Sequence, residues 1–169
     1  EFEETLFKKI HLLDLSKQAE VYLYTELIYI GNNHLSKANY YLNRILLESK
    51  LYFALPIYRT FRLIHLLVHY ELGNHDYIEY ETRSIKRSLS TSHNKTYLLE
   101  KIVLRFIQQS IPSPANKIRL WEKLKAEFEL ISINKYEIQL LKIFDFKSWI
   151  EARLCKKSFS ALLKEKHQN

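Results

Sequence analysis

Apolar residues recur along most of this chain at the three- and four-residue spacing of amphipathic helices. The longest periodic segments predict helices over residues 17–30, 35–49, 52–72, 77–90, 95–110 and 114–131. Shorter helices are expected over residues 1–14, 135–144 and 145–154, with a last helix from residue 158. The pattern therefore predicts an all-α fold: a lone first helix, three antiparallel hairpins over 17–131, and a C-terminal cap over 135–167.

The composition supports this prediction. The chain has 169 residues but contains two glycines and three prolines. Tight turns between strands use both residue types heavily, so a strand-rich fold would need more of them. Long helices with short connections suit such a composition better.

The two glycines mark the ends of helical patterns. Gly31 and Gly73 each follow an apolar residue and precede an asparagine. Glycine just past a helix end commonly adopts the left-handed conformation that terminates the helix. We therefore expect a positive φ at both glycines and short turns at 31–34 and 73–76. Such turns make the joined helices antiparallel.

Polar residues predict where several helices begin. Asp76 and Glu79 have the spacing of the N-cap and N3 residues in a capping box. Ser113 before Pro114 is a typical N-cap and first-turn pair. Asp145 and Ser158 are the expected N-caps of the last two helices.

The helix expected over 114–131 is clearly amphipathic. Its apolar stripe, which should pack on the rest of the domain, consists of Ile118, Trp121, Leu124, Phe128 and Ile131. On the other side, Lys123 and Glu127, and Lys125 and Glu129, are spaced to form i,i+4 ion pairs.

Histidines raise the question of a metal site in the segment 61–81. His65 and His69 are four residues apart and share a helix face, while His75 falls in the expected turn. A zinc-protease helix has Glu directly after the first His, and this chain has Leu66 there. Since no third ligand can be identified, we expect no metal and no other cofactor.

The helix expected over 52–72 is apolar around most of its circumference, which is typical of a buried central helix. Its narrow polar stripe contains Tyr58, Arg62, His65 and His69. One interpretation is a seam that reaches water or hydrogen-bonds a neighbouring helix. The other is the lining of a binding groove, and these four residues are its candidate binding residues.

The chain has a formal net charge of +7 and a pI near 9.3. A basic chain can bind nucleic acid. The candidate contacts are Arg83, Lys86 and Arg87 on the outer face of helix 77–90, with Tyr80 available to stack a base. Basic residues are, however, spread along the chain among acidic ones, so the charge also fits simple composition.

The first predicted hairpin resembles a tetratricopeptide repeat. Tyr22, Tyr29, Ala38, Leu42 and Ile45 fall on that family's spacing of large and small residues. The resemblance covers roughly residues 17–131 and implies a short α-solenoid in which Ala38 lets the paired helices approach. Segment 58–89 also looks like a region of uncharacterised bacterial helical-repeat proteins.

The chain departs from the tetratricopeptide-repeat pattern at several positions. Thr25 and Glu26 stand where the family usually has Leu-Gly, and Lys50 stands where it often has Pro. The second hairpin matches less well than the first. Such scaffolds bind many different partners, so the resemblance predicts architecture more than function.

These features favour a non-catalytic interaction scaffold that binds a protein or peptide, with a nucleic-acid-binding solenoid as the alternative. A His-dependent metal enzyme is a distant third. No catalytic triad context or glycine-rich phosphate loop is present, so we expect no enzyme activity. The lone Cys155 and the lack of a long apolar run fit a cytoplasmic protein without a membrane span. The chain lacks methionine, so we expect 1–169 to be one helical domain cut from a longer protein.

Overall fold

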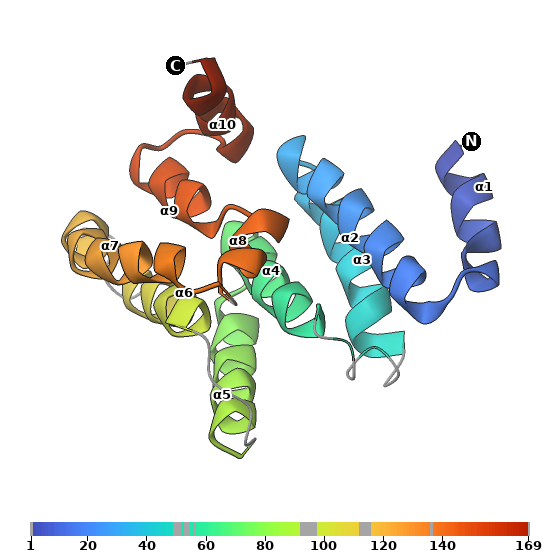
Figure 1. The fold of residues 1–169 in the computed structure, drawn as a ribbon, viewed down its shortest axis with the longest axis horizontal. Coiled ribbons are helices and arrows are strands. Elements are labelled where there is room, and N and C mark those ends of the chain that lie inside the picture. The colour runs from blue at the N-terminus through green and yellow to red at the C-terminus, as the bar shows by residue number, and fades with distance from the viewer. Residues whose placement is uncertain are drawn as a thin grey trace. The chain divides into compact units, whose positions relative to one another are not determined.

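The computed structural model describes residues 2–48, 52, 55, 57–91, 98–111, 116–135 and 137–168. These residues form ten α-helices and one 3₁₀ helix, η1, and no strand (Figure 1). The elements are α1 (Phe2–Lys9), η1 (Ile10–Leu12), α2 (Leu15–Gly31), α3 (Leu35–Glu48), α4 (Tyr58–Glu71), α5 (His75–Thr91), α6 (Leu98–Ser110), α7 (Lys117–Ile133), α8 (Ile138–Ile143), α9 (Phe146–Leu154) and α10 (Phe159–Gln168). The all-α prediction is confirmed.

The chain divides into two compact units, Glu1–Val68 and His69–Asn169, and the division falls within α4. The expectation of a single domain over 1–169 stays a prediction. Within the described part of the chain, no helix combines the length and apolarity that crossing a bilayer requires.

The first unit is built on the α2–α3 pair, whose helices lie antiparallel and side by side (Figure 1). Asp14 caps the start of α2, because its side chain accepts a hydrogen bond from the Lys17 backbone N–H at 3.0 Å. Ala38 of α3 is fully buried, as are Leu42 and Ile45 one and two turns later. A small residue at this position lets the two backbones approach, as the predicted hairpin requires.

The helices that precede the two predicted turns end in the same way. In the first turn, the N–H groups of Asn33 and His34 donate to Ile30 and Tyr29 oxygens. In the second turn, those of Gly73 and Asn74 donate to Tyr70 and His69 oxygens. This pair of bonds is the Schellman motif, which satisfies carbonyl groups that a helix end leaves free.

The left-handed residue of each turn is therefore Asn33 (φ 60°) or Gly73 (φ 73°). The prediction for Gly73 is confirmed and that for Gly31 is wrong. Gly31 is the last residue of α2, and the left-handed residue of the turn is Asn33, two positions later. Asparagine tolerates this conformation better than other residues with a side chain, so it can replace glycine there.

Two predicted helix starts are also wrong. Helix α5 begins at His75, so Asp76 lies inside its first turn rather than at the N-cap of a capping box with Glu79. Helix α4 begins at Tyr58 instead of residue 52. Pro56 explains the later start, because proline disfavours the helical conformation at the preceding Leu55.

Helix α4 is the buried central helix that its sequence predicts. Its apolar side chains are nearly inaccessible to solvent: Phe61, Leu63, Ile64, Leu66, Leu67 and Val68. Within the first unit, the ring of His65 connects it to α3 through Asn39.

The second unit packs α6 against α7, and α9 against α7 and α10. The predicted stripe of α7 is buried at Trp121, Leu124, Phe128 and Ile131, but Ile118 is 65% exposed. The expected i,i+4 pairs are replaced by ion pairs between helices. Glu127 binds Arg105 of α6, and Glu129 binds Lys147 of α9.

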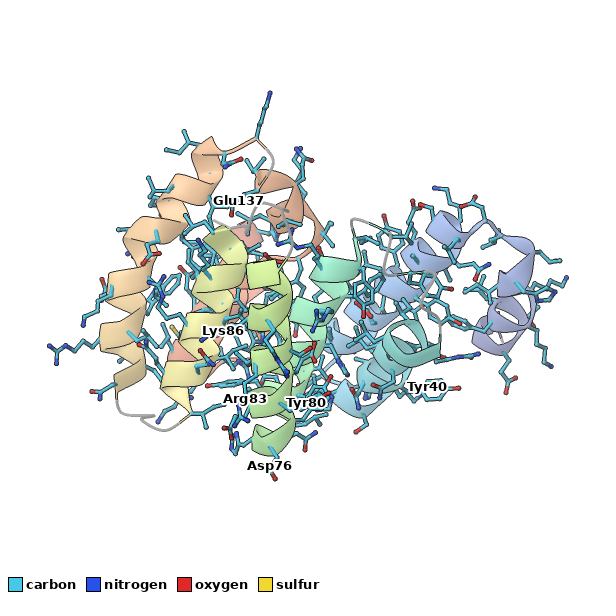
Figure 2. The ribbon with its side chains drawn as sticks, turned by 90° about the horizontal axis from the view of Figure 1, so that it is seen from below. Tyr40, Asp76, Tyr80, Arg83, Lys86 and Glu137 are labelled. Atoms are coloured by element: carbon cyan, nitrogen blue, oxygen red, sulfur yellow. The ribbon has the colours of Figure 1, made fainter. Side chains whose placement is uncertain are left out.

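Helix starts in the second unit are satisfied by side chains. Asp145 accepts from the Ser148 N–H at 2.9 Å and Ser158 accepts from the Ala161 N–H at 3.2 Å, which confirms both predicted caps. The buried Glu137, labelled in Figure 2, accepts from the Leu99 N–H at 2.8 Å and so caps α6 from a distant part of the chain. The predicted Ser113–Pro114 cap lies outside the described residues.

A polar network joins the end of α4 to α9 inside the second unit. Glu71 accepts a hydrogen bond from the Trp149 indole at 2.8 Å and pairs with the Arg153 guanidinium at 2.7 Å. Burial raises the pKa of the Glu71 carboxyl, and the neighbouring Arg153 partly offsets this effect. The network holds α9 on the end of α4.

Candidate functional site

The two histidines of the predicted polar stripe are buried and bonded to protein groups. His65 donates from Nε2 to the Asn39 side-chain oxygen at 3.0 Å. His69 accepts at Nδ1 from the Asn74 side-chain amide at 2.9 Å, and its ring stacks on Tyr77 at 3.9 Å. Both rings thus hydrogen-bond neighbouring parts of the protein, as the seam interpretation predicts.

These contacts bear on the chemistry of the histidines. Burial lowers the pKa of His69, which favours the neutral ring that accepts from Asn74. Among the described residues, no group of three or more His, Cys, Asp or Glu side chains is placed to hold a metal. Tyr58 and Arg62 are partly exposed, so their role as binding residues stays a prediction.

The candidate nucleic-acid residues lie along one exposed side of α5. Figure 2 shows Tyr80, Arg83 and Lys86 following one another on this helix, and Arg87 is also exposed. The Arg83 guanidinium pairs with Glu79, and the Lys86 ammonium donates to Gln108 at 2.7 Å. Arg83 and Lys86 thus already contact protein groups.

A pocket of about 330 Å³ lies between α1 and α2 in the first unit. Its walls come from two helices: Leu6 and Phe7 from α1, and Val21, Tyr24, Thr25, Ile28 and Tyr29 from α2. This volume is at the lower end of the range for ligand pockets. We call it the α1–α2 pocket.

The interior of the α1–α2 pocket is apolar. Thr25 is its one lining residue with an aliphatic hydroxyl, and that hydroxyl donates to the Val21 backbone oxygen of its own helix at 2.8 Å. The threonine therefore presents its methyl group. Tyr24 and Ile28, one turn apart, are 61% and 62% exposed. Single exposed apolar residues are common, but two that border an apolar pocket form a surface that a partner can cover.

The pocket exists because α2 is apolar on two opposite sides. Ala19, Tyr22, Leu23, Glu26 and Ile30 form its buried side. At about 100° per residue, Tyr24 and Ile28 point nearly opposite to this side. The short helix α1 covers the second side incompletely, which leaves the pocket between them.

An aromatic cluster, Phe7, Tyr22, Tyr29 and Tyr41, attaches α1 to the α2–α3 pair. The Phe7 ring lies 4.7 Å from that of Tyr41 and 5.2 Å from that of Tyr22, and Tyr29 stacks on Tyr41 at 5.7 Å. Such ring pairs stabilise beyond the area they bury. Two members of the cluster, Phe7 and Tyr29, also line the α1–α2 pocket.

Two cations of α3 lie over this cluster. The Lys37 ammonium is 5.3 Å from the centre of the Tyr29 ring, and the Arg44 guanidinium is 5.9 Å from that of Tyr22. Both distances suit cation–π interactions. Lys37 is exposed, so a positive charge stands beside a residue that lines the pocket.

Comparisons with protein-family models, with curated proteins and with solved structures find no match for this chain. The stacked helix pairs are compatible with a helical-repeat fold. The tetratricopeptide-repeat resemblance therefore stays a prediction.

Sequence reasoning missed the α1–α2 pocket. A signal was present, because segment 17–30 is apolar at more positions than one buried face needs. The pattern could not show that Phe7 would reach Tyr41, since that contact joins residues far apart in the chain. The two candidate sets named from the sequence lie elsewhere, on α4 and α5.

Proposed function

We propose that this chain is a non-catalytic interaction module and that the α1–α2 pocket receives an apolar side chain of a protein or peptide partner. The observation that carries the proposal is the pocket itself: an apolar cavity bordered by the exposed Tyr24 and Ile28. An aliphatic or aromatic side chain inserted there would bury both its own surface and theirs.

The shape of the site supports a helical or extended peptide over a small metabolite. The Thr25 hydroxyl already bonds its own helix, and the rest of the lining is aliphatic or aromatic, with tyrosine hydroxyls as its other polar groups. A partner that lays one apolar side over Tyr24 and Ile28 uses a common mode of peptide recognition, in which residues one turn apart fill a groove. Antiparallel helix pairs of the tetratricopeptide type present surfaces of this kind, which is the part the resemblance plays in the proposal.

A display library of random linear peptides tests the proposal. Selection on the wild-type chain should enrich peptides with large apolar residues three or four positions apart. These peptides should fail to bind the Ile28→Glu variant, because a charge at the pocket edge would have to be desolvated.

The matched control is Ile133→Glu, which places the same charge at a 79% exposed isoleucine of α7, outside the pocket. This variant should bind the selected peptides as wild type does. Peptides that bind the Ile28→Glu variant equally well, or that are not enriched at all, would refute the pocket as the binding site.

A further inference from the structure

We propose that Glu26 makes the α1–α2 pocket sensitive to pH: the pocket binds its partner while the Glu26 carboxyl keeps its proton, and it loses affinity when the proton leaves. This switch regulates the proposed binding function and therefore rests on it. Two observations carry it, the burial of Glu26 without a hydrogen-bond partner and the place of Glu26 on α2.

Glu26 lies on the buried side of α2. Its side chain is fully inaccessible to solvent, and its neighbours on that side, Tyr22, Leu23 and Ile30, are apolar or aromatic. Neither of its carboxyl oxygens has a hydrogen-bond partner among the described residues. A carboxylate in such a place has neither water nor a donor to stabilise its charge, so the fold favours the neutral acid.

Charged groups of neighbouring helices do not offset this burial. On α2 itself, Lys17 and Glu20 pair with each other at the start of the helix. The charged side chains that the structure describes on the other helices of the first unit are Glu4, Lys8 and Lys9 of α1, Lys37 and Arg44 of α3, and Arg59 and Arg62 of α4. On α4, the ring of His65 bonds Asn39. Burial is the one cause that raises the pKa of Glu26 among the described groups.

The same segment of α2 forms a wall of the pocket. Thr25 directly precedes Glu26, and Ile28 and Tyr29 follow it within one helical turn. All three line the α1–α2 pocket. Neighbouring residues of a helix move together, so α2 cannot turn or shift to bring a Glu26 carboxylate to water without displacing this wall. Loss of the proton should therefore change the pocket.

The direction of the effect follows from proton linkage. The state with Glu26 buried has a raised pKa at this carboxyl, whereas a state in which the carboxyl reaches water has the usual one. The buried state therefore binds the proton more tightly. Its advantage is present at low pH and is lost as pH rises through the raised pKa. The pocket should thus bind its partner best on the acid side of that pKa.

The test measures the affinity of a peptide selected on the wild-type chain, remade with blocked ends and without ionisable side chains. Wild type should bind it at least about threefold more weakly at about pH 9 than at about pH 6. In Glu26→Gln the amide imitates the protonated acid at every pH, so its affinity should change little. His34, whose ring lies 6.3 Å from that of Tyr29, is present in both proteins and cannot cause this difference.

The matched control is Glu20→Gln, which makes the same substitution on α2 at a residue outside its buried side. This variant should keep the decline seen in wild type. An equal decline in Glu26→Gln would overturn the switch, because another group would then carry the pH dependence. Ile28-dependent binding that is constant with pH in wild type would also overturn it and leave the proposed function standing.

The free protein gives a second readout that does not need a peptide. The Ile28 methyl NMR signal should move between these two pH values in wild type and stay in place in Glu26→Gln. A signal that moves in both proteins, or in neither, would overturn the switch. Absence of any Ile28-dependent peptide, with the signal moving in wild type alone, would overturn the proposed function and leave a proton-dependent change in the pocket.

Discussion

The α2–α3 and α4–α5 hairpins are two versions of one turn, and they differ in the side chains that surround it. In each, a helix ends, three residues connect, and the next helix begins, with corresponding residues 40 positions apart: Asn33 with Gly73, and Gly31 with Glu71. Both turns have the same hydrogen bonds. The backbone geometry is thus set by the helix end and does not require one particular residue.

The two hairpins differ in the side chains that meet across the turn. The first hairpin pairs Tyr29 with the exposed Lys37, beside the α1–α2 pocket. The second places His69 and Tyr77 at the corresponding positions, where they stack. The first pair leaves a charged ammonium group at the surface, whereas the second pair covers the surface with two stacked rings. Under the proposed function, the first hairpin borders the binding pocket, whereas the corresponding pair of the second hairpin stabilises its turn.

The largest expected effect concerns Glu71, at the end of α4. The Glu71→Ala variant should lower the free energy of unfolding by about 3 kcal/mol, because it leaves the Trp149 and Arg153 donors without their buried acceptor. Urea denaturation measures this change. A loss below about 1 kcal/mol would show that the network contributes little.

The next prediction concerns Glu26 of the first hairpin. The corresponding residue of the second hairpin is Leu66, and both side chains are fully buried. Neither Glu26 carboxyl oxygen has a hydrogen-bond partner among the described residues. Burial raises its pKa well above the usual range. Replacing it by Leu should therefore stabilise the protein at pH 7 by about 2 kcal/mol.

The same residue predicts a pH dependence. An unfolded chain releases the Glu26 proton near the usual pKa of a glutamate, whereas the folded chain retains it to a higher pH. The folded state therefore binds more protons in between, and its stability should fall as pH rises above about 5 toward the folded-state pKa. Unfolding curves across this range should show a smaller decline for Glu26→Leu. An equal decline in both proteins would contradict the assignment.

The two glycines should respond in opposite directions. Gly73 has φ 73°, so Gly73→Val should destabilise by about 1 kcal/mol or more. Gly31 is helical, and nothing lies within 4 Å of a Cβ added there. Gly31→Ala should therefore stabilise by about 0.5–1 kcal/mol. Thermal melts of both variants show whether each substitution stabilises or destabilises the protein. A loss of stability in Gly31→Ala would contradict the structure of the first turn.

The smallest effect is expected at Asn33, which has a left-handed backbone with φ 60°. Glycine adopts this conformation without strain, but it also makes the unfolded chain more flexible. These effects oppose each other, so Asn33→Gly should change the unfolding free energy by less than about 0.5 kcal/mol. A clear destabilisation would show that the asparagine side chain has a further role.

The turns show what the sequence could reveal. Their positions were predictable, because glycine and asparagine after an apolar helix mark a left-handed helix end. The choice among Gly31, Asn32 and Asn33 was not, since both glycine and asparagine suit the end of a helix. Which residue takes the positive φ depends on how far α2 continues.

The proposed binding site was less predictable. The apolar excess of segment 17–30 indicated that α2 has two buried sides, but the covering helix had to be known before the pocket could be located. Tyr58, Arg62, His65 and His69 were chosen because they interrupt an apolar helix. The rings of His65 and His69 hydrogen-bond neighbouring residues of the fold. A polar residue on a central helix can satisfy a structural need as well as a functional one.

Methyl NMR of isoleucine-labelled protein tests the central claim most directly, that the α1–α2 pocket is the binding site. On titration with a peptide selected on the wild-type chain, the Ile28 methyl signal should shift in proportion to occupancy. The signals of Ile118 and Ile133, which are at least as exposed as Ile28, should stay in place. Shifts at Ile118 or Ile133 with an unchanged Ile28 signal would contradict the account.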